Sequence, residues 1–244
     1  MKHAAAEFSV VLLAAGYGKR MLPLTRKTPK PLLKIGHQSL IEHHLLKLAG
    51  AGFKHVVINI AHLGEQIQNS LGSGGRFNLE IDYSDEIADG PLETAGGLMK
   101  ALPLIRSESF LSINADIFTD FPFTDLLCLL CHHQTEGHLV LVKNPEHNKR
   151  GDFLIDDNNL LKNRCGRIGN TYSGIAHFHK SLFLNEQSKL EHSNPEELNK
   201  AKIALAPLLR QWLMDNKLSA SLYHGNWTDV GTPQRLAELN TQFK

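Results

Sequence analysis

Short apolar runs alternate along the chain with longer stretches in which apolar residues recur every three or four positions. The short runs are rich in aliphatic and β-branched residues, which is typical of strands buried on both faces of a parallel sheet. Strands are predicted at 10–13, 54–60, 110–116 and 137–142. Helices are predicted at 40–48, 61–71 and 203–214. This alternation predicts an α/β fold with a mostly parallel sheet and helices on both faces.

Weaker patterns complete the chain. The segment 78–83 alternates like a strand near a sheet edge, 170–178 is β-like, and a dense turn signal at 156–159 suggests a hairpin. The polar segment 186–202 predicts a surface loop or short helix, and 126–131 is helically spaced. Cys128 and Cys131 share one face of that helix, which favours buried thiols over zinc or redox chemistry. The histidines are expected at the surface or with satisfied partners.

Composition narrows the class of protein. A chain of 244 residues suits one domain, 1–244, and its 42% apolar and 21% charged residues are typical of a soluble protein. No apolar run approaches the roughly 20 residues of a membrane helix, and the N-terminus lacks a secretory signal pattern, so a cytoplasmic location is expected. A net charge of +1 without a basic cluster argues against nucleic acid as a partner. No obligate protein partner is evident.

The segment 12–33 combines small residues with two separated cations. Small residues at the carboxyl end of the first strand let backbone N–H groups approach a ligand; they are Ala14, Ala15, Gly16 and Gly18. Lys19 lies in the same loop. Arg20 offers a planar fork for phosphate oxygens, and Lys30, held between two prolines, offers a point charge. We therefore predict a phosphate-binding loop here, with Arg20 and Lys30 as catalytic cations.

Three later segments carry further candidate residues. The loop that opens into a helix at 93–97 could hold a flat base, with Glu93 and Gly96 as nucleotide-binding candidates; the alternative is a helix capped by Thr94 with glycines for close packing. Asp116 ends the strand at 110–116, where it could hold Mg²⁺ or cap the following turn. Candidates for the sugar phosphate are Asn114, Asp152, Ser173 and Gly174; Asp152 could instead begin the hairpin.

The motifs together resemble the sugar-1-phosphate nucleotidyltransferases. The carrying strings are L-A-A-G-x-G-x-R-M-x-P-L-T-x-x-x-P-K-P-L, P-L-x-T-A-G-G and W-x-D-V-G-T-P. The resemblance implies a Rossmann-like, GT-A type fold in which a sugar 1-phosphate attacks the α-phosphorus of a nucleoside triphosphate. It also implies Mg²⁺ held by Asp116 and Asp229, with Asp116 among the catalytic residues.

The finer pattern adds N-P-x-H-x-x-x-G-D-F, T-Y-S-G-I and L-A-P-L-L-R. This set is most similar to the bacterial N-acetylmuramate α-1-phosphate uridylyltransferases of cell-wall recycling, which implies UTP and a sugar 1-phosphate as small-molecule substrates. Mannose-1-phosphate guanylyltransferases share most of the motifs. A regulator that keeps the fold but has lost turnover is the alternative of another class. Ser39 and Ala115 depart from the residues the family most often has, proline and glycine.

Overall fold

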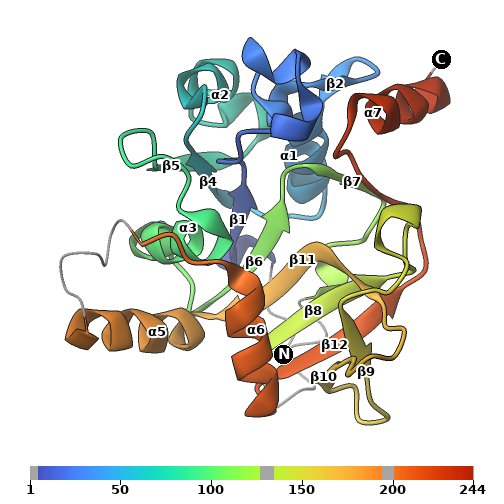
Figure 1. Ribbon diagram of the computed structural model, residues 1–244. Coiled ribbons are helices and arrows are strands. Elements are labelled where there is room, and N and C mark those ends of the chain that lie inside the picture. The colour runs from blue at the N-terminus through green and yellow to red at the C-terminus, as the bar shows by residue number, and fades with distance from the viewer. Residues whose placement is uncertain (1–4, 127–134, 194–200, 244) are drawn as a thin grey trace.

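The computed structural model describes residues 5–126, 135–193 and 201–243. At its centre is a seven-stranded sheet in the order β12-β8-β11-β6-β1-β4-β5 (Figure 1). The sheet consists of β1 (Ser9–Leu13), β4 (His55–Ile60), β5 (Glu80–Asp85), β6 (Ser109–Asn114), β8 (Gly137–Val142), β11 (Thr171–His179) and β12 (Leu218–Tyr223). Smaller pairs are β2 (Lys34–Ile35) with β3 (Gln38–Ser39), β7 (Ile117–Thr119) with β13 (Trp227–Asp229), and β9 (Phe153–Ile155) with β10 (Leu161–Asn163).

Helices cover both faces of the large sheet, as the alternation of strands and helices predicts. One face packs against α1 (Leu40–Gly50) and α2 (Gly64–Leu71), through a core that includes Val10, Leu12 and Leu45. The other face packs against α3 (Glu93–Ala101), α5 (Lys180–Ser193) and α6 (Leu205–Met214), through a core that includes Val11, Phe183 and Trp212. The C-terminal helix α7 (Pro233–Asn240) lies beside β2. The α/β fold with a mixed, mostly parallel sheet is therefore confirmed.

Two elements differ from the sequence-based expectation. The strand β12 was not predicted, because its sequence LSASLY is short and half of it consists of small residues. Of the two alternatives for the polar segment 186–202, a loop or a short helix, the helix is present as far as Ser193. It belongs to α5, which begins six residues earlier and buries Leu182 and Phe183. Among the described helices, none combines the length and apolar character needed to cross a bilayer.

Two smaller expectations were also wrong. The N-cap of α3 is Leu92, not Thr94, and no side chain caps this helix. His177 is buried and its two ring nitrogens have no hydrogen-bond partner among the described residues, although a satisfied histidine was expected. Burial lowers the pKa of His177 to about 3, so the ring is neutral at physiological pH. The helix expected at 126–131, with Cys128 and Cys131, lies outside the described residues except for Leu126.

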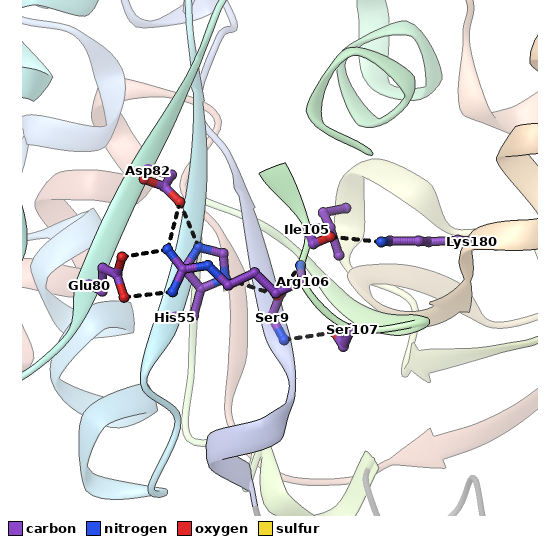
Figure 2. A network of polar contacts seen from close by, with 8 residues as sticks. All are labelled: Ser9, His55, Glu80, Asp82, Ile105, Arg106, Ser107 and Lys180. Atoms are coloured by element: carbon purple, nitrogen blue, oxygen red, sulfur yellow. Dashed lines mark hydrogen bonds and ion pairs between the residues drawn. The ribbon is translucent and has the colours of Figure 1, made fainter. Parts of the chain in front are cut away.

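A polar network ties the amino ends of the parallel strands together (Figure 2). Ser9 Oγ accepts a hydrogen bond from the Arg106 backbone N–H at 2.9 Å and contacts His55 Nδ1 at 2.8 Å. His55 Nε2 lies 2.9 Å from Asp82 Oδ2. The Arg106 guanidinium bonds both carboxylate oxygens of Glu80 and holds the pKa of Glu80 below its usual value. The network thereby joins β1, β4 and β5 to the segment that leads into β6.

The order Ser9, His55, Asp82 matches the residue types of a hydrolytic triad. Ser9 is only 1% exposed, however, and its oxygen already accepts the Arg106 N–H. A nucleophile must reach a substrate, so this network is better explained as a structural clamp on the sheet.

We expect Ser9→Ala to lower the free energy of unfolding by about 1–3 kcal/mol, because it leaves the Arg106 N–H and His55 Nδ1 without their buried partner. Urea unfolding followed by circular dichroism measures this. The control is Ser188→Ala at an exposed position of α5, for which the change should stay within about 0.5 kcal/mol. Equal stability of the two variants would contradict the clamp.

Candidate functional site

A cavity of about 480 Å³ opens at the carboxyl edge of the parallel strands. The strands β1, β4 and β6 run parallel, and Leu13 lies in register with both Asn59 and Asn114, so three consecutive strands end at one edge. The lining includes the first loop, the start of α3 and the ends of β4 and β6. It contains these residues singled out from the sequence: Ala14, Ala15, Gly16, Gly18, Lys19, Arg20, Lys30, Glu93, Asn114 and Asp116.

The first loop has the open backbone expected of a phosphate-binding segment. A Cβ added to Gly16 would meet no atom within 4 Å, so this residue leaves the cavity free. Gly18 has φ of +60°, and a Cβ there would lie 2.8 Å from Thr25 Cγ2, so the turn requires glycine. The Ala14 N–H donates to Asn59 Oδ1 at 2.6 Å. One of the predicted ligand-facing amides is therefore already bonded, and those of the following residues remain as candidates.

The two predicted cations differ in their surroundings. Lys30 is 7% exposed, and its Nζ lies 2.5 Å from Asp116 Oδ2. Arg20 and Lys19 are exposed at the cavity wall. The buried lysine is thus fixed against the carboxylate of β6, whereas the two exposed cations can follow a flexible polyphosphate.

A buried amide and a buried carboxylate support the second loop. Glu86 is fully buried; its Oε1 accepts from Asn59 Nδ2 at 2.8 Å and its Oε2 accepts from the Leu92 N–H at 2.8 Å. Burial raises the pKa of Glu86. A Cβ on Gly97 would lie 2.7 Å from Asn59 Nδ2, so glycine is needed beside this pair. The bridge fixes the loop between β5 and α3 against β4.

Gly96 has a packing role in the structure. A Cβ there would lie 2.7 Å from the Ala201 carbonyl oxygen, and the Gly96 N–H donates to the Ile203 carbonyl at 3.1 Å. The alternative of glycines for close packing is therefore confirmed for this helix. Glu93 begins α3 with φ of +64° and lines the cavity. Binding of a nucleotide by Glu93 and Gly96 stays a prediction.

The candidates for the sugar phosphate fall into two groups. Asn114 and Gly174 lie together, since a Cβ on Gly174 would be 2.6 Å from Asn114 Nδ2, and Asn114 faces the cavity. Ser173 and Asp152 already have internal partners: the Ser173 hydroxyl donates to the Val140 carbonyl, and the Asp152 carboxylate accepts from Asn148 Nδ2 and the Tyr172 N–H. These two side chains stabilise the bulge in β11 and the loop before β9.

The two candidate metal ligands lie on neighbouring chain segments but line different cavities. Val230 N–H donates to the Asp116 carbonyl at 3.0 Å, and Asp229 pairs with Ile117 across β13 and β7. The Asp116 side chain lines the first cavity, whereas Asp229 lines a second one of about 460 Å³. There Asp229 Oδ2 accepts from Arg235 Nη1 at 2.8 Å, with His147 Nε2 at 3.3 Å.

The donor set fits Mg²⁺ in its chemistry. Two carboxylates on neighbouring chain segments, one of them in the cavity of the first loop, match an ion that is usually held by one or two carboxylates, substrate phosphates and water. No cluster of three or more histidine, cysteine, aspartate or glutamate residues suited to a metal occurs within the described ranges. Any ion here would thus depend on the substrate for part of its coordination. Each carboxylate now faces a cation of the protein instead, Lys30 or Arg235.

Sequence reasoning did not propose the lining residues Asn59, Glu86 and Lys202. Asn59 lies one residue before the end of a predicted strand and Glu86 directly follows β5, so each lies near the carboxyl end of a strand, where parallel sheets carry polar ligands. That position was the available signal. Lys202 lines the first cavity, close to α3 through the hydrogen bond between Ile203 N–H and Leu92 O. Nothing local in the sequence marks Lys202, because its place depends on contacts with a distant helix.

Comparison with known proteins agrees with this geometry. The model of the nucleotidyl transferase family matches residues 9–155. An N-acetylmuramate α-1-phosphate uridylyltransferase of Neisseria meningitidis serogroup B is 42% identical over 93% of this chain and 95% of its own length. A mannose-1-phosphate guanylyltransferase catalytic subunit beta of Drosophila melanogaster is 30% identical over 92% of this chain, which spans 59% of that protein.

The fold also recurs among solved structures. A Bacillus anthracis protein assigned to glucose-1-phosphate thymidylyltransferase and solved with a sucrose superposes with a TM-score of 0.80 at 19% identity, covering 97% of this chain and 95% of that one. At this identity the likeness concerns the fold alone. The family match covers more than half of the chain and includes the predicted phosphate-binding loop, the loop before α3 and Asp116. The chain therefore belongs to the nucleotidyl transferase family.

Proposed function

We propose that this enzyme transfers UMP from UTP to N-acetylmuramate α-1-phosphate, giving UDP-N-acetylmuramate and pyrophosphate in peptidoglycan recycling. The observation that carries the proposal is the 42% identity, along nearly the whole length of both chains, to the Neisseria uridylyltransferase. Both substrates are small anions, and the reaction as proposed runs in the cytoplasm without nucleic acid, membrane or an obligate protein partner. Mannose-1-phosphate guanylyl transfer is the second candidate, supported by the Drosophila relative.

The proposed reaction needs no protein nucleophile. The attacking phosphate oxygen is already anionic, so the enzyme has to bring two polyanions together and stabilise charge on the α-phosphoryl group and the leaving pyrophosphate. Lys30, fixed beside Asp116, would bind the reacting phosphates, while Arg20 and Lys19 would bind the β- and γ-phosphates at the exposed wall. Amides of the loop at Gly16 and Gly18 would face the same oxygens.

The remaining residues position the two substrates. The loop held by Asn59 and Glu86 would carry the base, with Glu93 at its end. Asn114 and the backbone at Gly174 would border the sugar phosphate, and Asp152 and Ser173 would support that wall. Asp116 and Asp229 would hold Mg²⁺, which neutralises phosphate oxygens when bound. For this, Asp229 must turn from Arg235 toward Asp116. A non-catalytic binder would have no need of both carboxylates.

The test of the proposed function is pyrophosphate release with Mg²⁺ from a matrix of substrates. UTP, GTP and dTTP are each combined with N-acetylmuramate 1-phosphate, mannose 1-phosphate and glucose 1-phosphate. We expect release with UTP and the muramate. Release confined to GTP and mannose 1-phosphate would favour the second candidate, and no release from folded protein in any pairing would favour the non-catalytic binder.

We expect Lys30→Gln to lower kcat by on the order of 10²-fold or more, because it removes a preorganised cation from the reacting phosphates. The matched control is Lys34→Gln in β2, where the lysine is exposed and outside the cavity. Steady-state kinetics with both substrates saturating measures the difference. A kcat of Lys30→Gln within a few-fold of the control value would remove Lys30 from the mechanism.

We expect Glu86→Gln to raise the KM for UTP more than it lowers kcat. A glutamine offers only one carbonyl oxygen, so either the Asn59 amide or the Leu92 N–H loses its buried acceptor, at about 1–3 kcal/mol. The loop before α3 then loosens while Lys30 and Asp116 stay in place. The exposed Glu65→Gln in α2 serves as control. An unchanged KM together with unchanged thermal stability would contradict the positioning role.

A further inference from the structure

The second cavity shares Asp229 with the mechanism above, but its other lining residues have no role there. It is lined by the loop before β9, by β13 and by the start of α7, with Pro145, His147, Trp227, Asp229 and Arg235 among its residues. Trp227 Nε1 donates to the Ser173 carbonyl at 2.9 Å, so the wall of this cavity is bonded to the strand that borders the sugar phosphate. Contacts from Trp227 through Ser173 and Gly174 to Asn114 therefore link the walls of the two cavities.

The strongest cation in this cavity is Arg235, whose side chain is 21% exposed. Its Nη1 donates to both the carbonyl and Oδ2 of Asp229, at 3.0 and 2.8 Å. Within the described part of the chain these bonds use Nη1 alone, which leaves Nε and Nη2 as donors for a ligand. His147 Nε2 lies 3.3 Å from the same carboxylate oxygen. A carboxylate is thus already bound between Arg235 and His147, and it belongs to Asp229.

The other charged residues of the cavity lie toward solvent. Glu146 and Glu238 are exposed, and Glu238 Oε1 accepts from Gln234 Nε2 at 2.8 Å. They are solvated, so they repel an incoming anion less than a buried carboxylate would. Asp229, with 17% of its side chain exposed, is the more buried acid. If Asp229 turns toward Asp116, Arg235 keeps its bond to the Asp229 carbonyl but loses the carboxylate, and one carboxylate position becomes free.

We propose that Arg235, assisted by His147, binds the carboxylate of an acidic sugar 1-phosphate in the position that Asp229 occupies here. This inference rests on the proposed function, because N-acetylmuramate differs from N-acetylglucosamine by a lactyl ether with a carboxylate. The net charge around Arg235 stays the same, because the substrate carboxylate replaces that of Asp229. Pro145 and the Trp227 ring offer apolar surface to the lactyl methyl group. Arg235 is accordingly a residue that determines sugar specificity.

The experiment compares two nucleotide sugars that differ only in the lactyl ether, UDP-N-acetylmuramate and UDP-N-acetylglucosamine. Isothermal titration calorimetry with Mg²⁺ gives both dissociation constants. We expect the wild-type protein to prefer the muramate by about tenfold or more, the range of a charge-assisted hydrogen bond. Arg235→Gln should bring the ratio close to 1, Arg235→Lys should keep part of it, and His147→Gln should reduce it by a few-fold.

Arg150→Gln is the matched control, since it removes an equal charge from the exposed loop that carries His147, outside the cavity lining, and should keep the wild-type ratio. Because Arg235 also holds Asp229, absolute affinities can fall in its variants, and the ratio is the readout. A cooperative thermal transition like that of the wild type establishes that each variant is folded; His147→Gln, in an exposed loop, provides a second test.

A wild-type ratio near 1 would overturn the inference, and so would an Arg235→Gln ratio equal to that of Arg150→Gln. Either result is compatible with release of pyrophosphate from UTP and N-acetylmuramate 1-phosphate, in which case the proposed function stands and only the role of Arg235 fails. If no pyrophosphate is released from UTP with any of the sugar 1-phosphates, by contrast, the result would count against the proposed function itself.

Discussion

The parallel register of β1 with β4 and β6 is the constraint on which the site depends. It places Leu13 level with Asn59 on one side and Asn114 on the other, so that three chain segments leave the sheet at one edge. The carboxyl ends of parallel strands then share one crevice. Asn59 of β4 bonds the segments on both sides of it. Its Oδ1 accepts from the Ala14 N–H, just after β1, and its Nδ2 donates to Glu86, just after β5. The predicted phosphate-binding loop and the loop before α3 are positioned by this amide.

At the opposite, amino edge of the same strands, polar side chains form a closed hydrogen-bond network. There Ser9, His55, Asp82 and Arg106 bond one another, and Ser9 is buried within the network. Both edges use polar side chains, but at the amino edge the described partners satisfy them mutually, whereas at the carboxyl edge exposed Lys19 and Arg20 face a cavity. A buried polar group that is satisfied inside the protein stabilises the fold, and a cation facing a cavity can bind an anion.

Each candidate metal ligand of the site is paired with a cation of the protein that a divalent ion could replace. Asp116 faces Lys30 and Asp229 faces Arg235, so neither candidate metal ligand is an isolated charge. An isolated carboxylate at such depth would be costly, because its charge would lose hydration without gaining a partner. Protein cations can hold these carboxylates until phosphates and a divalent ion arrive. Asp152 and Ser173 likewise have partners within the protein: each forms a hydrogen bond with the backbone of the wall predicted to border the sugar.

The sequence by itself determined the features that local chemistry controls. Short apolar runs and helical spacing identified β1, β4, β6 and α1. The loop residues Gly16 and Gly18 and the cations Arg20 and Lys30 followed from residue type and spacing, and all of them line the cavity. Such features depend on periodicity and turn geometry over a few residues, which a linear pattern contains.

Only the tertiary structure decided the features that depend on distant partners. The strand β11 runs antiparallel to both β6 and β8, and β12 adds an edge that its small residues did not signal. The bridge from Asn59 to Glu86 spans 27 positions, and Lys202 reaches the cavity through the pairing of Ile203 with the start of α3. The orientation of Asp229 depends on which cation is nearest in space. Strand direction, buried hydrogen bonds and the choice of ion-pair partner are settled by packing between distant segments, for which the sequence carries no local signal.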